Sequence, residues 1–148
     1  GLSSLRLVQP RCFPDPEATA RAAGADDLLA RTTVFDDLAS AVSDCSFVIG
    51  ATARARAIEW PLYDSVTASD HVVAKSLQGG AAVVFGPEAS GLSNAQLDLC
   101  HAHLRIDVND AFPSLNVATA IAIVSYEIRK RLLSSVSPVP SQRRVKCP

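Results

Sequence analysis

The sequence predicts an α/β domain in which a parallel β-sheet is flanked by helices. Strand-like and helix-like segments alternate along the chain, a pattern typical of parallel sheets. Residues 81–85 form a continuous apolar run of the kind that a strand buried on both faces requires. Aromatic residues make up only 5% of the chain. The core must therefore consist of small aliphatic side chains, which suits helices packed closely on a sheet.

Length and composition indicate one folded domain followed by a short tail. The chain has 148 residues, of which 48% are hydrophobic and 20% charged, and this balance excludes a disordered, collagenous or coiled-coil chain. The last stretch is rich in proline and serine. We therefore expect a domain over residues 1–133 and a flexible tail or linker over 134–148.

The first half of the chain contains three expected strands and two expected helices. Residues 5–8 form a short apolar strand candidate that Pro10 closes, and residues 32–35 are β-prone. A helix over 16–23 has proline at its start and glycine just past its end. The remaining candidates are a helix over 37–42, whose acidic start suits the helix dipole, and a buried strand over 45–50.

The second half continues the alternation after the strand over 81–85 and the helix over 67–77 that precedes it. Ser93 and Gln96 match a capping box, which predicts a helix over 94–100. A strand is expected over 104–108 and a long helix over 115–133. The first half of that helix is apolar on nearly every face, so we expect the sheet, and a second subunit, to cover it.

Charge, cysteines and hydropathy exclude several classes of function. The 14 basic and 15 acidic residues nearly cancel, although the chain from Arg129 onward has six cations and no acid. That basic end either contacts phosphate or is a solvated tail. The scattered cysteines suit a reducing cytosol, so we expect a cytoplasmic protein, and no apolar run is long enough to span a membrane. Cys100, His101 and His103 lack a second ligand pair, so no metal is expected.

The segments that follow three expected strands are unusual for plain turns. Ligands of parallel sheets bind beyond the carboxyl ends of the strands. Residues 86–93 nearly match a phosphate-binding loop, but Leu92 stands where its lysine belongs, which argues against a nucleoside triphosphatase. A glycine-rich turn before a capped helix accounts for Gly91 but leaves the acid at Glu88 unexplained. Ser114, taken alone, suits the N-cap of the long helix.

These segments together resemble one enzyme family. Residues 85–93 and 113–120 are similar to the second and third motifs of the SpoU-type RNA ribose 2′-O-methyltransferases of the SPOUT class. Residues 52–56 and 22–25 look most like the TrmJ branch, the tRNA (cytidine/uridine-32) 2′-O-methyltransferases. The resemblance extends over residues 2–133, which is nearly the whole chain.

The resemblance implies a homodimeric enzyme with a C-terminal trefoil knot that transfers a methyl group from S-adenosylmethionine to a ribose 2′-hydroxyl in the anticodon loop of tRNA. Knots are rare, so this expectation rests on the family alone. The implied catalytic residues are Glu88, Ser114 and Asn116. The implied cofactor-binding residues are Thr52, Ala53, Gly86, Leu92, Ile106, Val108, Ser114 and Leu115. Arg54 and Arg56 are candidates for RNA contact, or belong to a solvated loop.

One part of the family pattern is missing. The family's first motif, an asparagine and an arginine on a helix, lies before the segment that matches residues 2–10, so an N-terminal strand and helix are expected to be absent. Three hypotheses remain. The chain is the truncated domain of a tRNA methyltransferase, a fragment that binds S-adenosylmethionine or RNA without activity, or part of a sister enzyme that methylates rRNA.

Overall fold

The computed structural model describes residues 2, 4–53, 60–109, 111 and 115–136. The strands are β1 (Arg6–Val8), β2 (Thr33–Phe35), β3 (Phe47–Ala51), β4 (Leu62–Tyr63), β5 (Ala81–Val84) and β6 (Ala102–Leu104). The helices are α1 (Pro16–Ala20), α2 (Asp26–Ala30), α3 (Leu38–Val42), α4 (Ser65–Gly79), α5 (Asn94–Leu97) and α6 (Val117–Val136).

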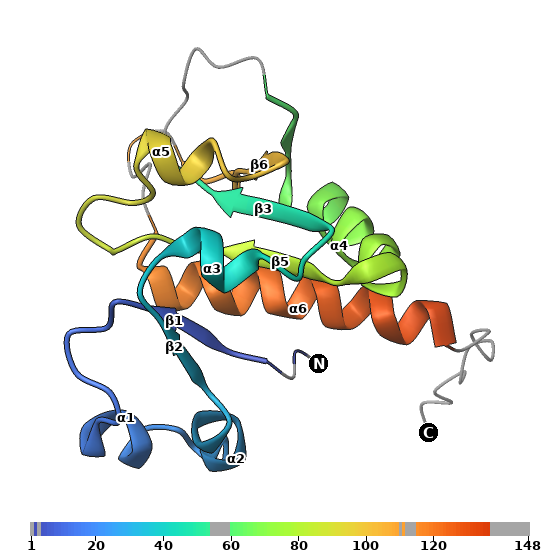
Figure 1. Ribbon diagram of the computed structural model, residues 1–148. Helices are drawn as coiled ribbons and strands as arrows, with labels where there is room; N and C mark the ends of the chain where they lie inside the picture. The colour runs from blue at the N-terminus through green and yellow to red at the C-terminus, as the bar shows by residue number, and fades with distance from the viewer. Residues whose placement is uncertain (1, 3, 54–59, 110, 112–114, 137–148) are drawn as a thin grey trace, which may run out of the picture.

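All strand pairs in the described part of the chain are parallel, which confirms the predicted α/β class. The main sheet has the order β4-β6-β3-β5, and β1 pairs with β2 in a second, two-stranded sheet. In Figure 1 the two-stranded sheet and its short helices form a small lobe beside the main sheet. Arg6 of β1 links this lobe to the chain before β3, because its guanidinium donates to Asp44 Oδ2 over 2.7 Å.

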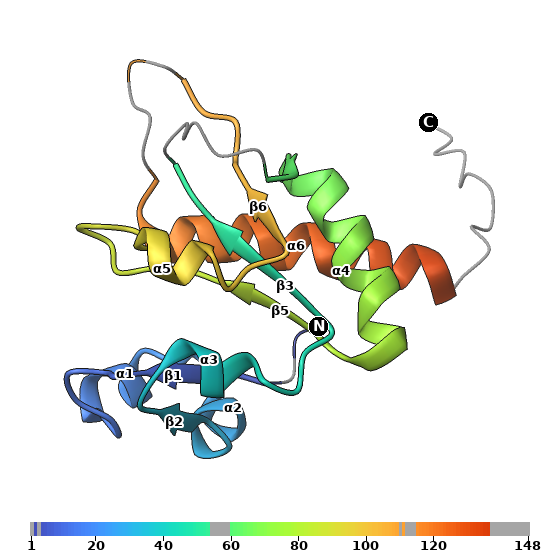
Figure 2. The same ribbon diagram turned by 45° about the horizontal axis from the view of Figure 1, so that its top comes forward.

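Helices cover both faces of the main sheet. The long helices α4 and α6 pack on one face, and α5 lies on the other (Figure 2). The core on the α4/α6 face is built from aliphatic side chains and one phenylalanine: Phe47, Ile49, Ala68, Val72, Ala102, Leu104, Val124 and Ile128. On the opposite face, a Cβ atom at Gly50 would lie 2.9 Å from Cys100 Sγ and 3.0 Å from Leu97, so α5 approaches β3 closely only because residue 50 is glycine.

Polar side chains cap the starts of α4 and α5. Asp64 accepts a hydrogen bond from the Thr67 amide at the start of α4. Ser93 and Gln96 form the reciprocal capping box predicted for α5. The resulting helix is shorter than the expected 94–100 and ends at Leu97. Beyond it the chain forms a turn, in which the Cys100 amide donates to Leu97 O.

Two predictions about the last third of the chain are wrong. The strand expected over 104–108 lies over Ala102–Leu104 instead, because pairing with β3 ends at Leu104. The final strand contact is made by the Arg105 amide, which donates to Tyr63 O. The long helix begins at Val117 and not at residue 115. The sequence also gave no indication of α2 or of the two-residue strand β4.

One side of α6 faces away from the core. Ile121 is 41% exposed and Tyr126 is 66% exposed, so the prediction that the domain's own sheet covers much of this apolar helix holds only for the side that contains Val124 and Ile128. None of the described helices combines the length and the apolar character that crossing a membrane would require.

Candidate functional site

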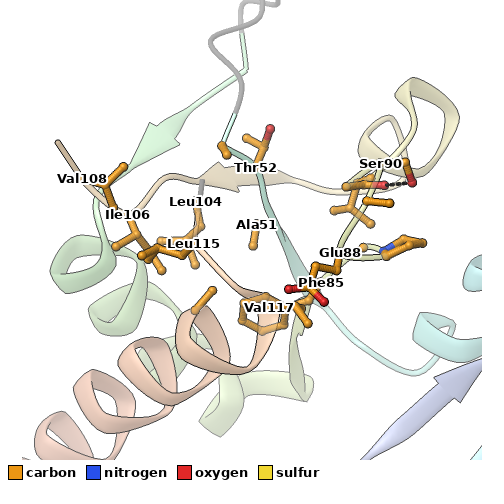
Figure 3. Close-up of a pocket in the computed structure, with 17 residues that line it drawn as sticks. Ala51, Thr52, Phe85, Glu88, Ser90, Leu104, Ile106, Val108, Leu115 and Val117 are labelled. Atoms are coloured by element: carbon orange, nitrogen blue, oxygen red, sulfur yellow. Dashed lines mark hydrogen bonds between the residues drawn. The ribbon is translucent and has the colours of Figure 1, made fainter. Parts of the chain in front are cut away.

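A cleft of about 330 Å³ opens where β3, β5 and β6 end, a volume in the usual range for small-ligand pockets. It lies at the carboxyl edge of the sheet, where parallel sheets bind ligands. In Figure 3, Ile106, Val108 and Leu115 gather at one side of the cleft, and Glu88 and Ser90 lie at the other. The lining residues are Ala51, Thr52, Ala53, Phe85, Gly86, Pro87, Glu88, Ala89, Ser90, Gly91, Leu92, Leu104, Ile106, Val108, Leu115, Val117 and Ala120.

The loop after β5 closes tightly on itself. The Gly91 amide donates to Pro87 O over 2.7 Å, and Gly91 has a φ of +65°, a conformation that favours glycine. A Cβ atom at Gly86 would lie 2.3 Å from the Gly91 carbonyl carbon and 2.4 Å from the Leu92 nitrogen. Gly86 therefore allows the two ends of the loop to touch, and main-chain atoms form this wall of the cleft.

A hydrogen bond between side chains joins the loop after β5 to the start of α6. Asn116 Nδ2 donates to Glu88 Oε1, although the two residues are 28 positions apart. Asn116 is also the N-cap of α6: its Oδ1 accepts from the amides of Ala118 and Thr119, and its carbonyl accepts from Ala120. The capping role expected of Ser114 thus belongs to Asn116 in the described structure, because the helix begins two residues later than predicted.

The apolar side of the cleft comes from residues that leave the sheet after β6. Ile106 and Val108 were expected within a strand and also as cofactor contacts; they lie beyond Leu104, where pairing with β3 ends, and both line the cleft. Leu92 also lines the cleft and is only 5% exposed. The main chain also ties the walls together, because the Thr52 amide donates to Leu104 O over 2.9 Å.

The structure brings most of the predicted site residues to this one cleft. The residues that line it are Thr52, Ala53, Gly86, Glu88, Leu92, Ile106, Val108 and Leu115, and Asn116 reaches it through its bond to Glu88. Ser114, Arg54 and Arg56 lie outside the described residues. Nine further lining residues were not named as site residues from the sequence: Ala51, Phe85, Pro87, Ala89, Ser90, Gly91, Leu104, Val117 and Ala120. Most of them lie within the segments that the sequence singled out, but their side chains are mostly small or apolar and do not mark them as functional.

The residues considered for a metal site have other roles. His101 Nδ1 accepts the Val48 amide hydrogen over 3.0 Å, and His103 is 5% exposed and packs beside Trp60. Burial raises the pKa of the Cys100 thiol to about 11, so this cysteine stays protonated at neutral pH. In the described part of the chain, no three His, Cys, Asp or Glu residues are grouped so that they could hold an ion.

Comparisons with known proteins show which proteins this chain is similar to. The chain matches the model of the SpoU rRNA Methylase family over residues 1–126. It is 44% identical over 139 residues to the tRNA (cytidine/uridine/adenosine-2′-O-)-methyltransferase TrmJ of Pseudomonas aeruginosa, covering 91% of this chain and 53% of that protein. It is 41% identical over 134 residues to the tRNA (cytidine/uridine-2′-O-)-methyltransferase TrmJ of Photorhabdus laumondii, covering 90% of this chain and 56% of that protein.

A solved structure shows the same fold. TrmJ from Z. mobilis superimposes with a TM-score of 0.83 at 37% identity, over 95% of this chain and 61% of that one. The chain thus spans little more than half the length of the curated relatives that it matches. The family model covers both segments that meet at the cleft through Glu88 and Asn116. With its parallel α/β fold and this match over most of its length, the chain belongs to the SpoU rRNA Methylase family.

Proposed function

We propose that this chain is the methyltransferase domain of an enzyme that methylates a ribose 2′-hydroxyl in the anticodon loop of tRNA, with S-adenosylmethionine as the methyl donor. The observation that carries the proposal is the meeting of the two family motifs at one cleft through the Glu88–Asn116 hydrogen bond. The names of the relatives support tRNA as the substrate. Because this chain corresponds to only part of those proteins, their activity is proposed for it here.

The cleft suits a methyl donor of this kind. Gly86 lets the main chain at Gly91 close one wall, and the small side chains of Ala51 and Ala53 leave the main chain after β3 open to close approach by a ligand. The apolar side that contains Ile106 and Val108 suits a flat adenine ring. The proposed cofactor-binding residues are Thr52, Ala53, Gly86, Leu92, Ile106, Val108, Ser114 and Leu115.

The reaction requires mainly positioning. When bound, S-adenosylmethionine supplies a methyl carbon to the ribose O2′: the C–O bond forms as the S–C bond breaks, sulfur keeps the electron pair, and the hydroxyl proton passes to a general base. The chain's part is to hold donor and ribose in line and to keep water away, as the apolar walls at Ile106 and Leu115 would do.

The proposed catalytic residues have different roles. Glu88 presents a carboxylate at the cleft, where it can orient the ribose. Both polar atoms of the Asn116 side chain are already bonded: Oδ1 accepts in the helix cap, and Nδ2 donates to Glu88. We therefore assign Asn116 a positioning role. Ser114 is proposed from its place in the third motif and lies outside the described residues. Arg54 and Arg56, also outside them, are proposed to contact RNA phosphates.

The finer fold features are also proposals. They are a C-terminal trefoil knot and an N-terminal strand and helix that carry the first motif. The open edges of the sheets support the second feature: in the described structure β5 pairs only with β3 and β1 only with β2. Another parallel strand can pair with either edge. The domain is proposed to cover residues 1–133, with 134–148 as a linker.

The enzyme is proposed to act as a homodimer in the cytoplasm, where tRNA is processed. The exposed apolar residues Ile121 and Tyr126 on α6 support a partner subunit. Analytical ultracentrifugation of the purified protein tests this. A dimer is expected, and a monomer at micromolar concentration would contradict it.

Mass spectrometry of RNA from cells with and without the gene tests the function. We expect one 2′-O-methyl group to disappear from tRNA while rRNA keeps its full set. A loss confined to rRNA would support a sister enzyme instead, a second candidate favoured by the family's own description. Unchanged methylation in both RNAs would reject the proposal.

The family's first motif is not among the segments recognised in residues 1–148, which leads to a separate expectation for these residues alone. We expect this chain to bind the donor but to transfer methyl groups weakly or not at all, whereas a protein with the motif restored transfers them. Calorimetry with S-adenosylmethionine and a radiolabelled methyl-transfer assay on tRNA measure the two properties. Robust transfer by residues 1–148 would show that the first motif is dispensable.

A further inference from the structure

We infer that the Glu88 carboxylate attracts the positive charge of the methyl donor. The cleft thereby distinguishes the sulfonium cation of S-adenosylmethionine from the neutral thioether of S-adenosylhomocysteine. This inference rests on the proposed function. It assigns to Glu88 a task in ligand selection that is separate from any contact with ribose.

The charge pattern of the cleft is the first observation. Glu88 is the one charged residue among the described residues that line it, and no lysine, arginine or histidine accompanies it there. The other lining residues are apolar, small or hydroxyl-bearing. The described lining therefore carries a single negative charge, which attracts a cation and gives no attraction to a neutral ligand of the same shape.

The position of that charge is the second observation. Asn116 Nδ2 holds the Glu88 carboxylate, and Asn116 is itself held by its bonds to the first turn of α6. The backbone of the same loop is closed by Gly86 and Gly91. The negative charge is thus fixed in place before any ligand arrives.

The arrangement of the two sides is the third observation. Figure 3 shows Ile106, Val108 and Leu115 at the side opposite Glu88. The donor and its product share the adenosine part, so apolar contacts with this side bind both molecules equally. The two ligands differ by the methyl group and by one unit of charge on sulfur. Within the described lining, Glu88 is the residue that can respond to the difference in charge.

The consequence concerns turnover. Transfer of the methyl group removes the positive charge from sulfur, and the attraction to Glu88 disappears with it. The thioether product is then held mainly by the contacts that any adenosine ligand would make. The Glu88 carboxylate therefore favours replacement of the product, S-adenosylhomocysteine, by a new molecule of S-adenosylmethionine.

Isothermal titration calorimetry of the purified protein tests the inference with S-adenosylmethionine and S-adenosylhomocysteine as probes. The quantity of interest is the ratio of the two Kd values, product over donor. Two unit charges about 4 Å apart interact weakly in water-like surroundings, which corresponds to about a fivefold factor in affinity. We expect Glu88→Gln to lower the ratio about fivefold. Glu17→Gln is the matched control, because it removes one charge from exposed α1, away from the cleft.

A second measurement needs no substitution. Raising the salt concentration from about 0.05 M to about 0.5 M screens exposed charges, so the ratio for the unaltered protein should fall toward that of Glu88→Gln. Sinefungin, which carries an ammonium group in place of the sulfonium, should follow the donor in both experiments.

The outcomes are distinct. Equal weakening of both ligands by Glu88→Gln, or a ratio that is insensitive to salt, would overturn the inference and leave the proposed function intact. An unaltered protein that binds neither ligand would overturn the proposed function, and this inference with it. An equal change with Glu17→Gln would show that net charge, and not Glu88, sets the preference.

Discussion

Gly86→Ala is the sharpest perturbation of the cleft. The new Cβ would lie 2.3 Å from the Gly91 carbonyl carbon, 2.4 Å from the Leu92 nitrogen and 2.7 Å from the Gly91 oxygen. Carbon atoms in contact normally stay about 3.5–4.0 Å apart, so the two backbones must separate by more than about 1 Å. All three neighbours are main-chain atoms, which no rotamer change can move aside. Gly86 itself needs no left-handed φ, so the clash is the whole effect.

Gly91→Ala is the matched control in the same loop. A Cβ at Gly91 meets nothing within 4 Å, and its cost arises only from the φ of +65°. That conformation costs a residue with a side chain about 1–2 kcal/mol. Overpacking against rigid neighbours costs about 3 kcal/mol or more, so Gly86→Ala should lower the free energy of unfolding further than the control does.

Urea denaturation followed by circular dichroism measures the free energy of unfolding of both variants, and thermal melts measure their Tm. For a domain of this size, about 3 kcal/mol corresponds to a fall in Tm of about 6–12 °C. Calorimetry with S-adenosylmethionine should show that Gly86→Ala also loses binding, since the loop wall is displaced. Equal stability of the two alanine variants, with donor binding retained by Gly86→Ala, would refute the steric reasoning.

The remaining predictions concern two side-chain pairs, Asn116 with Glu88 and Arg6 with Asp44. Asn116→Ala should lower the free energy of unfolding by about 1 kcal/mol through loss of the α6 cap. Asn116→Asp keeps a capping oxygen but sets a carboxylate against Glu88, so Glu88→Gln should restore stability lost in Asn116→Asp; no such rescue in a double-mutant cycle would contradict the pairing. Arg6 lowers the pKa of Asp44 to about 2, so the pair stabilises the fold above the ordinary pKa of about 3.9 and this contribution is lost as the pH falls through about 2. In thermal melts, Asp44→Asn should flatten the loss of Tm between about pH 4 and 2, and an unaltered slope would argue against the pair's role.

The features predicted well from the sequence are those with a local signal. The apolar run at 81–85 forms β5 over Ala81–Val84, and the Ser93–Gln96 box caps α5. Both signals lie within a few neighbouring residues, so no distant contact was needed to read them. The convergence of the strand-end segments also followed from local reasoning, because carboxyl ends of parallel strands share one edge.

Features decided by distant partners could not be read in the same way. Strand β6 ends at Leu104 because its partners on β3 and β4 end there, although the apolar pattern continues to Val108. The choice of Asn116 over Ser114 as the described cap of α6 depends on where the helix begins and on Glu88, 28 residues away. Strand β4 is only two residues long and has no room for a pattern.

The wall of the cleft that is formed by Gly86 and Gly91 consists of main-chain atoms. A comparison of reactive side chains, by which enzymes are usually related to one another, does not detect such a wall. As homologues diverge, many residues around the cleft can be substituted, provided that the length of the loop and these two glycines are kept. Distant homologues of this domain are therefore better sought by the spacing of their glycines than by a shared set of acids and bases.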